Sequence, residues 1–284
     1  MTNATFTLSA FGDEIAPALE DQCSLLKELN VLHLELRATW GTNVLKMTNE
    51  DVAKVKQVLA EYGVQVSCLG SPVGKSAIID PIQNELDNLT RLFQIGDALD
   101  TKNIRIFSFY PPDISTNAHY DQHVDEAVDR LNQMGALAEN SGFYLMLENE
   151  KEIVGDTVDR MKKILAGIES PNVQFAWDPA NFVQCGEANL TERAWPILSE
   201  YIGYIHIKDA VLEDGSVRPA GEGDGQVSEL LAKLKETGYQ GMLALEPHLK
   251  VAGHSSGFSG AGGMTLAVEA LRKLMTEHNL TEVH

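Results

Sequence analysis

Short apolar segments alternate with segments of helical periodicity along the whole chain of 284 residues. In each helical segment apolar side chains recur every three or four positions, and glycine ends several of them, as Gly63, Gly142 and Gly238 do. Units of this kind, about 30 residues long, are typical of βαβ structure and predict a parallel sheet. We expect its eight strands at residues 6–11, 32–37, 64–69, 104–107, 143–147, 173–177, 204–207 and 242–245.

The number of units favours an α/β fold of one particular kind, a closed (β/α)8 TIM barrel. No linker, charge run or low-complexity segment divides the units, so residues 1–284 are expected to form a single domain. The alternative is an open, doubly wound sheet, which usually carries a glycine-rich phosphate-binding turn after its first strand. Gly12-Asp13-Glu14 follows the first strand here and is not such a turn.

Four successive predicted strands end in a side chain that can bind a metal ion. Burying a carboxylate is costly unless it is paired or bound to a metal. In a TIM barrel the carboxyl ends of the strands line the open face that holds the active site. The side chains at these four ends are Glu148, Asp178, His206 and Glu246.

Strand parity supports this interpretation, because alternate residues of a strand face opposite sides of the sheet. If the four ligand candidates point into the barrel, then small or flexible side chains such as Met146, Ala176 and Ala244 share their face. The other face is then large and apolar on all four strands. Each of the four residues taken alone is more often a loop residue, a helix cap or a structural histidine, but the set favours a shared function.

Three carboxylates and one imidazole around one point predict a site for one divalent metal ion. The oxygen-rich set favours Mn²⁺ or Mg²⁺, and the imidazole leaves Co²⁺ and Zn²⁺ open.

The net charge of the chain limits the kinds of molecule that we expect it to bind. It carries 22 basic and 41 acidic residues, a formal net charge of −19, which argues against nucleic acids and anionic membranes. Three scattered cysteines imply no disulfide framework and fit a reducing compartment. Without a basic leader or a long apolar run, the chain is expected to be a soluble cytoplasmic protein. A homo-oligomeric state stays open.

Four motifs at the strand ends resemble the xylose isomerase-like TIM barrel superfamily. That superfamily includes sugar phosphate isomerases, ketose 3-epimerases, inosose dehydratases and the endonuclease IV type of AP endonuclease. The resemblance implies that the four candidates hold the metal and that Glu148 and Glu246 form the acid–base pair. The motifs are Leu145-Met146-Leu147-Glu148, Trp177-Asp178-Pro179-Ala180-Asn181, His206-Ile207-Lys208-Asp209 and Leu245-Glu246-Pro247.

One motif departs from the family pattern. Many relatives carry Asp-x-x-His on the sixth strand, where this chain has Asp178 followed by Asn181. Additional histidines build a multi-zinc centre in the endonuclease type, so their absence from this motif and the acidic composition favour a sugar enzyme with a single metal ion. We expect Asn181 to hydrogen-bond a substrate hydroxyl.

The ligand set also predicts a reaction. A cation that polarises a carbonyl acidifies the neighbouring C–H, and a carboxylate can then remove the proton to form an enediolate. Return of the proton gives isomerisation or epimerisation of a sugar, sugar phosphate or polyol, which is our prediction. Loss of a hydroxyl would make the protein a dehydratase (lyase) on a keto-sugar or inosose. A sugar-binding barrel without catalysis is the alternative from another class.

Further side chains near the predicted strand ends are candidates for substrate binding. Lys208 shares a face with His206, and Arg218 lies in the loop after the seventh strand, where relatives place an arginine near substrate. Trp40 follows the second strand and is placed to stack on a sugar or to cover the core. The complete predicted set is Glu35, Trp40, Glu150, Asn181, Lys208, Arg218 and His248.

Overall fold

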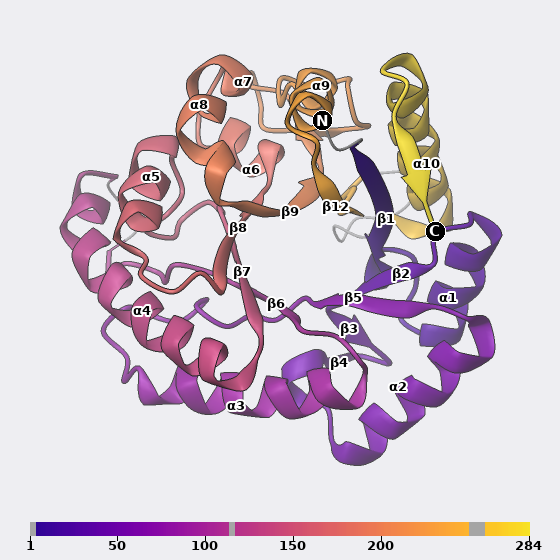
Figure 1. Cartoon of the computed structure of the whole chain (residues 1–284), viewed down its shortest axis with the longest axis horizontal. Helices are drawn as coiled ribbons and strands as arrows, with labels where there is room; N and C mark the ends of the chain where they lie inside the picture. Colours follow the sequence, from indigo (N-terminus) through magenta and orange to yellow (C-terminus); the bar gives the residue numbers. More distant parts are fainter. Residues whose placement is uncertain (1–3, 114–116, 250–258) are drawn as a thin grey trace.

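The computed structural model describes residues 4–113, 117–249 and 259–284, which form a closed parallel barrel. Strand β12 pairs with β1 over six residue pairs, from Thr5 opposite Gln240 to Ala10 opposite Leu245, and this pairing closes the cylinder. The predicted (β/α)8 TIM barrel is confirmed, with the strands as an inner ring (Figure 1). In order around the ring the strands are β1 (Thr5–Phe11), β2 (His33–Leu36), β5 (Gln65–Leu69), β6 (Asn103–Ile106), β7 (Tyr144–Glu148), β8 (Val173–Trp177), β9 (Ile202–Ile207) and β12 (Gln240–Leu245).

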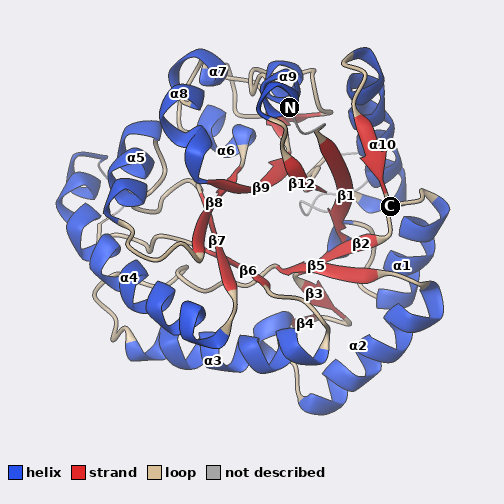
Figure 2. Ribbon diagram, in the orientation of Figure 1, coloured by secondary structure: helices blue, strands red, loops and turns tan. Residues whose placement is uncertain are grey.

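Helices surround the strands as an outer layer (Figure 2). The capping signals in the sequence explain their ends: Thr48 and Asp51 form a capping box, and Gly63 ends the same helix in the left-handed conformation. The α-helices are α1 (Leu19–Glu28), α2 (Asn49–Tyr62), α3 (Gln83–Ala98), α4 (Val124–Ser141), α5 (Val158–Gly167), α6 (Pro179–Gln184), α7 (Leu190–Arg193), α8 (Trp195–Leu198), α9 (Val227–Thr237) and α10 (Gly260–Glu277). The 3-10 helices are η1 (Gly12–Glu14), η2 (Val44–Lys46), η3 (Asn117–His123) and η4 (Ser199–Tyr201).

Several short elements have no counterpart in the sequence-based expectation. The connection after β8 contains three short helices, α6, α7 and α8, with prolines in the first turns of α6 and α8. Two small hairpins lie in the loops after β2 and β9, formed by β3 (Ala38–Thr39) with β4 (Thr42–Asn43) and β10 (Asp209–Ala210) with β11 (Val217–Arg218). Strand β13 (Thr281–Val283) adds to the start of β1.

The core has two layers, as the strand parity predicts. Large apolar residues such as Leu147, Trp177 and Leu245 face the helices and form the main core. Inside the barrel a separate small cluster contains Cys68, Met146, Ala176, Tyr204 and Ala244. The phenol of Tyr204 donates a hydrogen bond to Ser67 across the interior, so the barrel floor is packed and closed below the strand ends.

No helix in the described part of the chain combines the length and the apolar character that crossing a membrane requires. The three cysteines are free thiols.

Candidate metal centre

The four strand ends bring Glu148, Asp178, His206 and Glu246 to one point at the mouth of the barrel. Each offers one ligand atom, and these atoms all lie within 4.8 Å of one another. All four side chains are buried. They come from β7, β8, β9 and β12, which are consecutive around the ring, so the closure of the barrel itself assembles the cluster.

Local structure fixes Asp178 in this position. Its backbone is extended at the end of β8, and its Oδ1 accepts a hydrogen bond from the backbone N–H of Asn181, which caps α6. Pro179 in the first turn favours the same helix start. Asn149 ties the neighbouring strand end to it, because its amide donates to the Asp178 carbonyl and accepts from the Asp178 N–H.

The imidazole of His206 lies between two carboxylates. Its Nε2 is 3.3 Å from Oε2 of Glu35, and its Nδ1 is 3.1 Å from Oε1 of Glu148. Although burial favours the neutral ring, the carboxylates of Glu148 and Glu35 raise the pKa of His206 well above its usual range. In the metal-free protein these two carboxylates favour the imidazolium form of the ring.

Two buried cations compensate the carboxylates. The Lys208 ammonium donates to Asp178 at 3.1 Å, to Asn181 at 2.9 Å and to Glu246 at 3.2 Å. Arg105 on β6 pairs with Glu148. Burial raises the pKa of Asp178 to about 6 although Lys208 opposes the change. Burial also acts on Glu148, but the charges of His206 and Arg105 outweigh it and lower the pKa of Glu148 to about 2.

A third cation closes the outer side of the cluster. Arg37 donates to Glu246 at 2.6 Å, to Asp13 at 2.7 Å and to Glu14 at 2.9 Å. His248 also contacts Glu246, with its Nε2 3.2 Å from the carboxylate. Burial opposes the effect of these neighbours, but Lys208, His248 and Arg37 lower the pKa of Glu246 well below its usual range. Glu246 is therefore ionised.

The structure divides the predicted substrate-binding residues into two groups. Glu35, Asn181, Lys208 and His248 contact the cluster directly, and Glu150 two residues after Glu148 pairs with Lys75. The other two contact residues outside the cluster in the described structure. Trp40 donates its indole N–H to Glu20 and lies under the Lys54 ammonium, and Arg218 is exposed on β11 and donates to the carbonyl of Val217.

Two arginines of the site were missed from sequence. Arg105 lies between Ile104 and Ile106 in a strand, so parity alone places it on the inner face of the barrel. A lone basic residue inside a buried strand was the available signal. Arg37 comes two residues after Glu35, so the alternation of side chains along the strand places both on the same, polar face.

The donor set fits a divalent cation. His206 Nδ1 and Glu148 Oε2 are buried and make no hydrogen bond in the described structure, and their nearest charged neighbours are Glu148 Oε1 at 3.1 Å and Arg105 Nη1 at 3.3 Å. Carboxylate oxygens with one imidazole suit Mn²⁺ or Mg²⁺ and are compatible with Co²⁺ and Zn²⁺. Glu148, Asp178, His206 and Glu246 are the residues that could hold such an ion.

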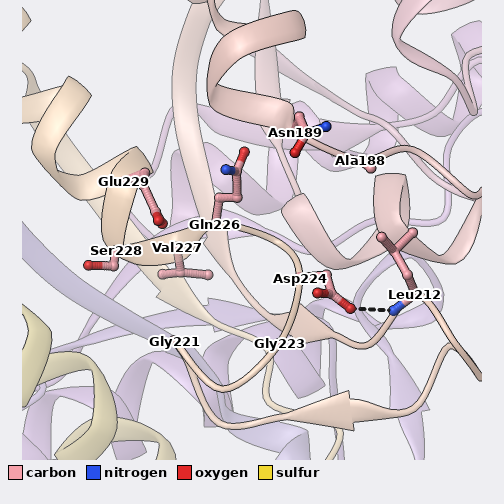
Figure 3. A pocket seen from close by; sticks show the side chains of 10 residues that line it. All are labelled: Ala188, Asn189, Leu212, Gly221, Gly223, Asp224, Gln226, Val227, Ser228 and Glu229. Carbon is pink, nitrogen blue, oxygen red and sulfur yellow. Dashed lines mark hydrogen bonds between the residues drawn. The ribbon is translucent and has the colours of Figure 1, made fainter.

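Apart from the cluster, a hollow lies between the loop before α9 and the start of α7. None of the four ligand candidates lines it. Its side chains are mostly small or polar, and Asp224 accepts a hydrogen bond from the backbone N–H of Leu212 at 2.7 Å (Figure 3).

Solved structures share the fold over nearly their whole length. A D-tagatose 3-epimerase-like protein has a TM-score of 0.76 at 18% identity, over 96% of this chain and 98% of that one. The probable 3-DHS dehydratase AsbF from Bacillus anthracis has a TM-score of 0.70 at 15% identity, over 95% of this chain and 99% of that one. A xylose isomerase-like TIM barrel protein from Mycobacterium smegmatis in complex with magnesium has a TM-score of 0.66 at 17% identity, over 96% of this chain and 97% of that one. At these identities the likeness shows the fold alone.

Sequence comparisons narrow the fold to a family. The uncharacterized protein MJ1311 of Methanocaldococcus jannaschii is 28% identical over 153 residues, which are 52% of this chain. The match spans only 51% of that protein. The family model described as xylose isomerase-like TIM barrel matches residues 23–274. With a match over most of its length, this chain belongs to the xylose isomerase-like TIM barrel family.

Proposed function

We propose that the protein is a metal-dependent isomerase or epimerase that acts on a sugar or a related polyol. The observation that carries the proposal is the convergence of Glu148, Asp178, His206 and Glu246 within 4.8 Å at the barrel mouth. In this proposal the four side chains hold one divalent cation. When bound, the cation would supply Lewis-acid polarisation of a substrate carbonyl.

Glu148 and Glu246 would move the proton. Both are ionised carboxylates on different strands, so one can remove a proton from the carbon beside the carbonyl and the other can return one. Return to the opposite face of the carbon gives an epimer, and return to the neighbouring carbon gives an isomer. Asn181, Lys208 and His248 contact this pair, and together with Glu150 they are proposed to orient the substrate hydroxyls.

The related structures support this proposal without deciding the reaction. One is described as D-tagatose 3-epimerase-like, and another holds magnesium, which suits an oxygen-rich site. A third is described as a probable dehydratase. Dehydration begins with the same proton removal, so it is kept as the second candidate.

Solvent exchange tests the proposal directly. The protein loaded with Mn²⁺ would be incubated in D₂O with keto-sugars and inososes, and the substrates would then be analysed by NMR after removal of the metal. We expect deuterium at a carbon beside the carbonyl, and its loss in the E148Q and E246Q variants. E85Q is the matched control, because Glu85 is a buried glutamate on α3 that bonds Ser76 and Asn88 instead of the cluster.

The products separate the candidates. An epimer or isomer would support the proposed reaction, and an unsaturated product with one water fewer would identify a dehydratase. Sugar binding without any exchange in the wild-type protein would contradict an enzymatic role and leave a sugar-binding barrel.

A further inference from the structure

Glu35 and His206 form a contact inside the barrel that the proposed chemistry does not use. Nε2 of His206 lies 3.3 Å from Oε2 of Glu35, and both side chains are at most 1% exposed. Glu35 lies in β2, one residue before its end, whereas the four ligand candidates come from the consecutive strands β7, β8, β9 and β12. Glu35 reaches the cluster through the imidazole of His206, whereas the sequence analysis predicted that it binds substrate.

Two aromatic side chains pack against the imidazole of His206 and restrict the plane of its ring. Phe11 meets the imidazole edge-on with ring centroids 5.2 Å apart, and Tyr204 does the same at 5.7 Å. Tyr204 is itself held by its hydrogen bond to Ser67. Within this plane Nε2 lies towards Glu35 and Nδ1 towards Glu148.

The two ring nitrogens need different partners. A neutral imidazole has one N–H donor and one nitrogen with a free electron pair. If Nδ1 gives its pair to a cation, the proton must lie on Nε2, where it needs an acceptor in a place without water. Glu35 Oε2 is that acceptor, and Nδ1 makes no hydrogen bond of its own in the described structure.

We propose that Glu35 is a positioning residue, which holds the proton on Nε2 of His206 and thereby presents Nδ1 to the cation. This inference rests on the proposed metal-dependent function. A carboxylate behind a ligating histidine fixes the tautomer and the ring orientation and strengthens the ligand. Glu35 would act through His206 and would not touch the substrate.

Metal affinity is the first test. Binding of Mn²⁺ to the metal-free protein would be measured by titration calorimetry for the wild type, E35Q, E35M and the control E85Q. We expect about 10–100-fold weaker binding for E35M, in which the acceptor is lost. E35Q should lie between E35M and the wild type, because its amide oxygen can still accept from Nε2–H, and E85Q should bind as the wild type does.

The ring itself gives the second readout. In the Zn²⁺-loaded protein, ¹⁵N NMR of His206 should show a protonated Nε2, with its proton shifted downfield by the carboxylate in the wild type and less so in E35Q. A structural role for Glu35 would move the melting temperature and leave these signals unchanged. Equal Mn²⁺ affinity and an equal Nε2–H signal in E35Q and the wild type would overturn the inference. Failure of the wild type to bind Mn²⁺, by contrast, would contradict the proposed function itself.

Discussion

Nη1 of Arg105 lies 3.3 Å from Oε2 of Glu148, and the two side chains are only 6% and 1% exposed. The same nitrogen lies 3.8 Å from Oε1 of Glu246, so one guanidinium from β6 stands between the two proposed acid–base residues. Its charge also lies over the rings of Phe11 and Phe107, at 5.0 and 4.9 Å. Together with Lys208, Arg105 is thus an internal counter-ion of the carboxylate cluster.

Replacing Arg105 by Met should destabilise the metal-free protein strongly. The variant removes one of the two positive charges beside the buried Glu148, the other being His206, and breaking a buried ion pair typically costs about 3–5 kcal/mol. Unfolding by urea in the presence of EDTA would measure the loss. Added Mn²⁺ should restore part of it, because a bound cation supplies positive charge to the same carboxylates.

The control for this experiment is K233M. Lys233 pairs with Glu236 on the surface of α9 and its side chain is 39% exposed, so its loss should change the free energy of unfolding by no more than about 0.5 kcal/mol. A loss of similar size in R105M, or no recovery with Mn²⁺, would show that Arg105 does not balance the cluster.

The cysteines should resist alkylation in the folded protein. Burial raises the pKa of Cys23 and of Cys185 to about 12 in each case, from an ordinary value of 9.0. Because only the thiolate reacts, a rise of this size makes reaction at pH 8 about 1,000-fold slower than for a free thiol. We expect iodoacetamide to leave the native protein unmodified by mass spectrometry and to label all three cysteines in urea. Rapid labelling of the half-buried Cys185 in the native protein would contradict this.

Much of the fold follows from local sequence patterns. Apolar runs, capping residues such as Thr48, and terminal glycines such as Gly63 act within a few positions, so they can be recognised without knowing the tertiary structure. The convergence of the four ligand candidates at the barrel mouth could also be predicted from the sequence, because closing a barrel brings the carboxyl ends of consecutive strands next to one another. Parity then separated inward residues such as Met146 from outward ones such as Leu147, and both lie where it predicted.

The positions of side chains in the loops could not be predicted from the sequence in the same way. Trp40 and Arg218 lie in the hairpins formed by β3 with β4 and by β10 with β11, which are too short to leave a periodic pattern. The site roles of Arg37 and Arg105 depend on carboxylates more than 40 positions away, such as Glu148 and Glu246. Nothing within either local segment identifies those partners.

Gly74 should tolerate alanine far less well than Gly63. Both have positive φ angles, +81° and +71°, which alone cost an alanine roughly 1–2 kcal/mol. At Gly63 the added carbon meets nothing within 4 Å, whereas at Gly74 it would lie 2.0 Å from the backbone oxygen of Phe107. We therefore expect G74A to lose about 2–5 kcal/mol and G63A about 1–2 kcal/mol in urea unfolding. Similar losses would show that the loop at Gly74 moves freely away from β6.

Asp209 should control the loop that leads from β11 to α9. Its carboxylate accepts hydrogen bonds from the backbone N–H groups of Gly221, Gly223 and Gly225, at 2.9, 3.1 and 2.9 Å. In D209N an NH₂ group replaces one carboxylate oxygen, so a hydrogen-bond donor faces the backbone N–H donors of the loop. We expect the free energy of unfolding to fall by about 1.5–3 kcal/mol.

The same variant tests whether this loop belongs to the substrate site. Arg218 pairs with Asp209 in register across the β10–β11 hairpin, so a displaced loop should raise KM while Mn²⁺ affinity stays unchanged, because Asp209 contacts none of the four ligand candidates. D214N is the matched control, since the exposed Asp214 accepts from the N–H of Ser216 in the same hairpin and makes no hydrogen bond to the loop glycines. Lower Mn²⁺ affinity in D209N would instead mean that the loop supports the metal centre, and an unchanged KM would remove Arg218 from the substrate-binding residues.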